Sequence, residues 1–217
     1  MQKFNLKNEW RAITLVLAGF FLSIISYPYL PERVVSHWNF YGQADGWMSR
    51  SFNCWLFPLI LLAMYLLFWL MPKFDPKKER YAEFSGVYIG MRDAIIFIFF
   101  CVFTVATIYN LGYPINVGVA VATLIGLLMM VLGNYFGKLK RNWFIGIRTP
   151  WTLSSENVWN KTHRLGGRLF MVWGALIILA PWLPMAWGMG VLLGGIALIL
   201  IFINIFSYRL YKKEQKK

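Results

Sequence analysis

The sequence has few charged residues, and very few of them are acidic. Only 14% of its 217 residues are charged and only 9 are Asp or Glu, while 59% are hydrophobic. Soluble globular domains average about 25% charged and about 45–50% apolar residues. The composition therefore excludes an ordinary soluble protein, and the apolar stretches leave no room for a large soluble domain.

Sequence motifs of catalytic and metal sites are also missing. The chain has no His-Glu-x-x-His, no phosphate-binding glycine loop and no Gly-x-Ser-x-Gly turn. Its only histidines, His37 and His163, are expected on opposite sides of a membrane, so they cannot share an ion. A zinc site needs three or four ligands, whereas the loop around His37 adds only Asp45 and Glu32. We predict no metal, no cofactor and no enzymatic activity.

Six apolar runs are long enough, or nearly so, to cross a bilayer, which takes about 20 residues. They cover about 12–29, 54–71, 88–109, 115–135, 169–184 and 188–207. The predicted fold class is an all-α integral membrane protein with six transmembrane helices. We divide it into a two-span unit, residues 1–85 with an outer loop at 30–53, and a four-span unit, residues 86–217 with a cytosolic segment at 136–168.

The basic residues lie almost entirely on one side of these spans. Of the 22 Lys and Arg residues, only Arg33 and Arg50 fall in predicted outer loops if the N-terminus is cytosolic. Cytosolic loops of membrane proteins carry an excess of Lys and Arg. We therefore predict cytosolic N- and C-termini. The net charge of +13 then reports membrane topology, and no direct nucleic-acid binding is predicted.

The segment RNWFIGIRTPWTLSSENVWNKTHR, residues 141–164, is polar and aromatic between two apolar runs. We expect a turn before Pro150, then a short helix that is N-capped by Thr152 or Ser154 and ended by Gly166-Gly167. Glu156 is expected to pair with Arg148 or Arg164. Two interpretations remain open, an amphipathic helix anchored on anionic lipid and a surface for a specific ligand or protein partner.

Three pairs of glycines follow the small-xxx-small spacing that lets membrane helices approach closely. They are Gly86/Gly90, Gly133/Gly137 and Gly190/Gly194. We favour packing within the chain over a dimer seam, because the spacing is common in apolar helices.

Two stretches resemble known families. GIRTPWTLSSENVWNKTHRLGGR is similar to the signature of the SdpI family, the immunity proteins against the sporulation-delaying toxin. LPERVVSHWNFYGQADGW in the first outer loop resembles a domain of unassigned function that is often found at the N-terminus of such proteins. Together the two resemblances cover most of the chain.

The resemblance implies a multi-pass protein of a bacterial plasma membrane that protects its producer from a secreted peptide toxin. It also implies signal transduction, in which a cytosolic transcriptional repressor is held at the membrane. Carried over by position, the toxin-facing candidates are His37, Asn39, Gly42 and Asp45. The candidates for binding a cytosolic partner are Arg148, Thr149, Pro150, Trp151, Glu156, Trp159, His163 and Arg164.

Two other functions compete with immunity. A small-solute or peptide transporter usually carries ionisable residues near the bilayer midplane, where each charge costs about 2.5–3.5 kcal/mol or more. The predicted spans are almost free of charge, apart from Arg92 and Asp93 near the inner end of the third. In a membrane-embedded enzyme, His37 and Asp45 would act as an acid–base pair. The sequence shows no evident nucleophile to work with them.

Overall fold

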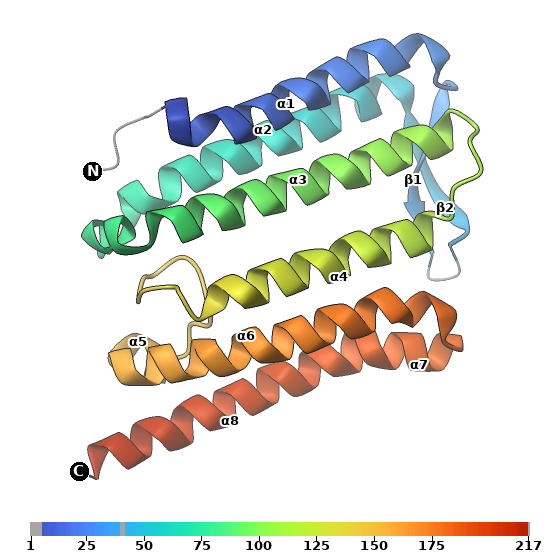
Figure 1. Ribbon diagram of the computed structural model, residues 1–217. Coiled ribbons are helices and arrows are strands. Elements are labelled where there is room, and N and C mark those ends of the chain that lie inside the picture. The colour runs from blue at the N-terminus through green and yellow to red at the C-terminus, as the bar shows by residue number, and fades with distance from the viewer. Residues whose placement is uncertain (1–5, 40–41, 217) are drawn as a thin grey trace.

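The computed structural model describes residues 6–39 and 42–216. Six long helices run side by side, each antiparallel to the next (Figure 1). They are α1 (Leu6–Ser26), α2 (Arg50–Phe74), α3 (Ser85–Asn110), α4 (Val117–Phe136), α6 (Glu156–Leu179) and α8 (Gly195–Gln215). Within these described ranges, six helical segments are long and apolar enough to cross a membrane, which confirms the predicted fold class.

Short elements join the long helices. Single turns occur at η1 (Tyr27–Tyr29) and η3 (Ala180–Trp182), and η2 (Lys78–Phe84) leads into α3. The short helix α5 (Pro150–Ser154) precedes α6, while α7 (Met185–Met189) and the π-helical η4 (Gly190–Gly194) continue into α8. The sixth span is therefore helical from Met185 to Gln215.

A two-stranded antiparallel hairpin, which was not predicted from the sequence, forms between α1 and α2, within residues 30–53. Its strands are β1 (Arg33–Trp38) and β2 (Ala44–Ser49). β1 contains two adjacent valines and a tryptophan, residue types that favour strands. The register is irregular on both sides of His37, which lies opposite Gly46. These interruptions hide the regular alternation by which a strand is recognised in sequence.

The molecule has two distinct ends (Figure 1). The hairpin and the α3–α4 and α6–α7 connections lie at one end, which we call the hairpin end. The start of α1, the end of α8, η2 and α5 lie at the other, which we call the basic end. Among the described residues, the Lys and Arg side chains other than Arg33 and Arg50 belong to segments at or near the basic end.

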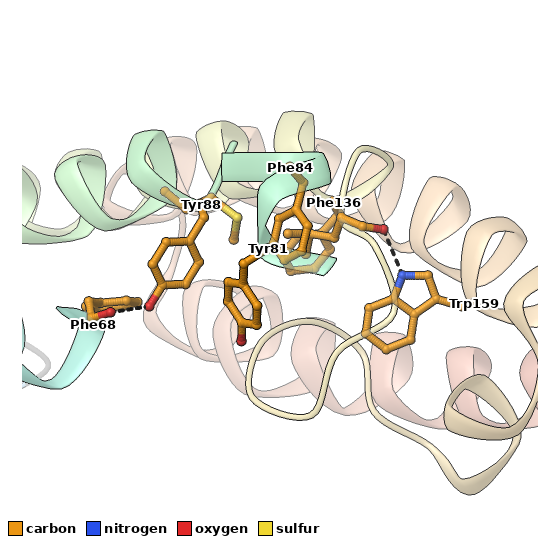
Figure 2. Packing of buried hydrophobic residues seen from close by; sticks show 8 residues of the cluster. Phe68, Tyr81, Phe84, Tyr88, Phe136 and Trp159 are labelled. Atoms are coloured by element: carbon orange, nitrogen blue, oxygen red, sulfur yellow. Dashed lines mark hydrogen bonds between the residues drawn. The ribbon is translucent and has the colours of Figure 1, made fainter. Parts of the chain in front are cut away.

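An aromatic cluster at the basic end joins the two halves of the chain (Figure 2). The N-terminal half and the start of α3 contribute one set of buried side chains, and α4, the loop after it and α6 contribute the other. The cluster consists of Phe68, Tyr81, Phe84, Tyr88, Met91, Phe136, Leu139 and Trp159. Packing thus continues across residues 85 and 86, and the division into two units stays a prediction.

Glycines bring α4 and α6 into backbone contact. A Cβ added at Gly133 would lie 2.5 Å from the carbonyl oxygen of Gly167, and one at Gly126 would lie 2.5 Å from that of Gly174. The spacing on each helix is seven residues, or two turns, which returns to the same helix face. Of the predicted pairs, Gly133 has this role and Gly90 faces Tyr135, but Gly86, Gly190 and Gly194 have nothing within 4 Å of an added Cβ.

Candidate functional site

Two regions contain the candidate residues, the hairpin and the 141–164 segment. In the hairpin, His37 Nδ1 lies 2.5 Å from Asp45 Oδ1 across the two strands. Both side chains are exposed, by 71% and 42%. A Cβ on Gly46 would lie 2.9 Å from the His37 Cβ, so glycine opposite His37 leaves room for it. The pair presents an imidazole and a carboxylate to the surroundings at a fixed separation.

Asn39 and Gly42 shape the tip of the hairpin. The Asn39 side chain accepts a hydrogen bond from the Gln43 backbone at 3.0 Å and donates to the Gln43 side chain at 3.2 Å. Gly42 has a φ of +74°, a conformation that glycine adopts at no steric cost. These two candidates therefore fold the turn, while His37 and Asp45 face outward.

The hairpin is fastened to the end of α3 by Asn110, a residue that the sequence analysis missed. The Val35 amide donates to Asn110 Oδ1 at 2.7 Å, and Asn110 Nδ2 donates to the Val35 carbonyl at 2.9 Å. Trp38 packs edge-on against Tyr109, with ring centroids 5.2 Å apart. A lone Asn in the last turn of an apolar helix is the sequence signal that was available.

At the basic end, a buried asparagine folds the first part of the 141–164 segment. Asn142 is 0% exposed. Its Oδ1 accepts from the amides of Phe144 and Ile145 at 2.9 and 2.7 Å, and its Nδ2 donates to the carbonyls of Lys140 and Ile145 at 2.9 and 3.0 Å. The Asn142 side chain thus forms the hydrogen bonds that backbone groups would form with one another in a helix or sheet, and it makes the turn compact.

Thr149 and Ser155 cap the helices of the segment, so the expected capping by Thr152 or Ser154 is wrong. Thr149 caps α5 in a capping box with Thr152, and Ser155 caps α6. Pro150 takes the first helical position, where its missing N–H is no loss, and this puts the cap at Thr149. The Thr149 hydroxyl also donates to Ser207 of α8 at 3.2 Å.

Trp159 and His163 are both 0% exposed and stack at a centroid separation of 4.0 Å. Trp159 Nε1 donates to the Leu139 carbonyl at 2.8 Å (Figure 2). His163 Nε2 accepts from the Ile147 amide at 2.9 Å, and Nδ1 lies 2.8 Å from the Trp159 carbonyl. An amide only donates and a carbonyl only accepts. These partners therefore assign the proton to Nδ1 and hold the loop against α6.

Gly166-Gly167 does not end a short helix, because α6 continues from Glu156 to Leu179. A Cβ on Gly167 would lie 2.4 Å from the Gly133 carbonyl oxygen. The close packing of α4 on α6 outweighs the low helix propensity of glycine, and the segment after Ser155 is the first part of the fifth span.

The remaining candidates lie at or near the surface. Arg148, Pro150, Glu156 and Arg164 are exposed, and Trp151 is half-buried beside Tyr208 of α8, with ring centroids 5.1 Å apart. Arg148 donates to the Trp143 carbonyl at 2.7 Å. The eight candidates thus divide into an exposed set and a buried set of Thr149, Trp159 and His163.

Two residues from the loop between α2 and α3 hold the 141–164 segment, and neither was predicted to do so. Glu156 pairs with Arg80 at 2.6 Å, not with Arg148 or Arg164. Asp75, 2% exposed, accepts from the Trp143 amide at 2.9 Å and from the Tyr81 hydroxyl at 3.0 Å. Both partners are distant in sequence, so local spacing does not reveal them.

The electrostatic surroundings of that loop are positive. Burial lowers the pKa of Lys77, and the neighbouring charges of Arg141 and Arg80 lower it further, while Asp75 and Glu156 act in the opposite direction. Within the part of the chain that the structure describes, no three His, Cys, Asp or Glu side chains are grouped to hold a metal ion.

Comparison with known proteins supports both resemblances. Residues 138–207 match the SdpI/YfhL protein family, and residues 14–62 match a domain of unknown function, DUF1648. The chain is 26% identical over 208 residues to the immunity protein SdpI of Bacillus subtilis (strain 168), covering 96% of this chain and 98% of the relative. No solved structure matches significantly.

Proposed function

We propose that this protein, a member of the SdpI/YfhL family by its residues 138–207, is a toxin-immunity protein of a bacterial plasma membrane. One observation carries the proposal. The similarity to an immunity protein covers 96% of this chain and 98% of the relative, so it includes all six spans, the hairpin and the 141–164 segment. A shared C-terminal segment alone would not support a common function of both faces.

The basic end faces the cytosol in this proposal. Its excess of Lys and Arg is the support, because short cytosolic loops hold such charges. An even number of spans places both termini on that side. The hairpin then faces the exterior, where a secreted peptide toxin arrives.

The hairpin binds the toxin through side chains that the fold leaves exposed. His37 Nδ1 and Asp45 Oδ1 bond each other at 2.5 Å, which fixes the pair and leaves the other imidazole nitrogen and the other carboxylate oxygen to meet a ligand. On the same strands, Trp47 is 50% exposed and supplies an apolar surface for an amphipathic peptide. Asn110 holds the hairpin on α3, so the site is preorganised, which reduces the entropy lost on binding. Immunity in this account is binding without catalysis.

The exposed part of the 141–164 segment is the cytosolic output. Arg148 uses one N–H group on the Trp143 carbonyl, and a guanidinium has five such donors in a planar fork. Arg164 and Pro150 are exposed around it. This surface suits a protein partner such as a cytosolic transcriptional repressor, with anionic lipid as the competing ligand.

Survival of a toxin-sensitive Bacillus strain under added sporulation-delaying toxin tests the proposal. Cells expressing the wild-type protein should survive and cells with an empty vector should not. His37→Ala should lose protection at equal membrane abundance, while Glu32→Ala, an exposed carboxylate in the same loop, should keep it. Absence of protection by verified wild-type protein would overturn immunity. Solute flux in proteoliposomes would then favour the transporter.

A further inference from the structure

A cavity of about 250 Å³ opens at the basic end between α1, α2 and α3. Its lining includes Glu9, Lys73, Lys78, Tyr81, Tyr88 and Arg92. Exposure of the two lysines shows that the cavity reaches the surface there. Binding sites for drug-sized molecules are roughly 300–1,000 Å³, so this one has room for a small headgroup rather than a whole amphiphile.

The floor of the cavity is a closed ion cluster. Arg92 is 2% exposed and pairs with Glu9 at 2.6 Å and with Asp93 at 3.0 Å. Its third contact is the Asn8 carbonyl at 2.8 Å. Two carboxylates outnumber the one guanidinium, so the floor opposes an anion, and the charge of an anionic ligand has to be met at the mouth. The cluster joins α1 to α3, and it thereby fixes the distance between these two helices at the floor of the cavity.

The mouth of the cavity is cationic. Lys73 and Lys78 stand there, opposed by Glu79 alone among the exposed acidic lining residues. The Lys73 ammonium rests over the Trp69 ring, 2.9 Å from its centroid, an arrangement that orients a cation without neutralising it. Basic pockets between membrane helices bind phosphate headgroups, and these two lysines make the mouth of this cavity such a pocket.

The wall toward the membrane is apolar. Phe68, Trp69 and Pro72 of α2 face Ile89 of α3 across the cavity lining. α2 ends at Phe74, directly after this wall, which puts the mouth at the depth of lipid headgroups. A free phosphate ion would leave this apolar wall uncovered, whereas the glycerol and first methylenes of a lipid would cover it.

We propose that this cavity binds the phosphate headgroup of an anionic phospholipid from the inner leaflet, with Lys73 and Lys78 meeting the phosphate. The lipid would occupy a wedge between α1 and the α2–α3 hairpin of helices. This site is separate from the toxin-facing hairpin and does not depend on immunity, although its assignment to the inner leaflet rests on the cytosolic orientation proposed above for the basic end. Each lysine near such a headgroup contributes about fivefold in affinity.

Native mass spectrometry of the purified full-length protein tests the site by titration with phosphatidylglycerol. Lys73→Gln with Lys78→Gln should weaken binding roughly 25-fold. The matched control removes the same charge from the exposed end of α8, by Lys213→Gln with Lys216→Gln, and should leave the affinity unchanged. Glu79→Gln should tighten binding, because it removes the opposing charge at the mouth.

Three outcomes would overturn the proposal. An equal loss in the cavity and tail variants would mean diffuse attraction to the basic end. Equal binding of phosphatidylcholine would remove the role of headgroup charge. Binding of free glycerol phosphate as tight as that of phosphatidylglycerol would identify a soluble phosphate ligand. Both lysines are exposed, so the variants should fold, and circular dichroism with size-exclusion chromatography verifies it.

Discussion

The hairpin and the 141–164 segment have similar compositions but use their polar and aromatic residues in opposite ways. The hairpin turns its candidate pair, His37 and Asp45, outward. The 141–164 segment buries Trp159 and His163 completely. Trp159 Nε1 and His163 Nε2 form hydrogen bonds with backbone groups of the loop between α4 and α5. A sequence motif of this kind therefore contains residues that hold the fold together as well as residues that are free to bind a partner. The burial of each side chain distinguishes the two groups.

The largest contrast between the regions is expected at their positive-φ glycines. Gly146 has a φ of +109°, and an added Cβ would lie 2.4 Å from His163 Nε2, whereas Gly42 has a φ of +74° and only Asn116 Oδ1 at 4.0 Å. Backbone strain alone costs about 1–3 kcal/mol. Gly146→Ala should add a steric clash and abolish folded protein in the membrane.

Gly42→Ala should lower stability by only about 1 kcal/mol. Membrane abundance and thermal unfolding in detergent measure both variants. Equal losses would mean that the 141–164 loop is no more tightly constrained than the hairpin tip, and the contrast between the regions would fail.

The two histidines give the next largest effect. His163→Ala leaves the partly buried Ile147 amide without its acceptor, which costs about 1–3 kcal/mol, and it opens a cavity beside Trp159. His37→Ala changes an exposed side chain, so it should alter stability by less than about 0.5 kcal/mol while removing protection. Thermal unfolding and survival under toxin, measured on both variants, should give opposite rankings.

A smaller effect is expected at Arg148, which is exposed and donates to the Trp143 carbonyl. Arg148→Lys keeps the charge but loses the planar fork of donors. Stability should change by less than about 0.5 kcal/mol, and protection from toxin should persist.

Binding of a cytosolic partner should fall for Arg148→Lys but not for Arg168→Lys, an exposed Arg farther along α6. Co-purification of cytosolic protein with the two variants measures this difference. Equal recovery, or equal dependence on anionic lipid alone, would assign the exposed part of the 141–164 segment to membrane anchoring.

Several features of the fold followed from local sequence. The six apolar runs predicted the spans because their lengths match or approach what a bilayer requires, and the shortest, 169–184, is part of a longer span, Glu156–Trp182. Other features did not follow. The hairpin was missed because its register is irregular around His37. The α4–α6 contact uses glycines that are seven residues apart on each helix, whereas the predicted glycine pairs are four residues apart.

Among the candidate residues, the sequence predicted which types matter but not which of them face outward. His37 and Asp45 lie eight residues apart in one loop, and the structure pairs them across the two strands of the hairpin. Glu156 was expected to pair within its own segment, but Arg80 reaches it from the loop between α2 and α3. Contacts of this kind depend on how α2, α3 and α6 meet, which no local spacing records.

The sequence by itself determined the number of spans and the asymmetry of charge between the two ends, because both depend on summed properties of the chain, namely apolar length and the placement of Lys and Arg. Only the tertiary structure decided that Trp159 and His163 lie inside and that Arg148 lies outside. A buried N–H or carbonyl requires a hydrogen-bond partner within about 3 Å. That partner can belong to a segment distant in sequence, so only the packing of the helices decides which residue it is.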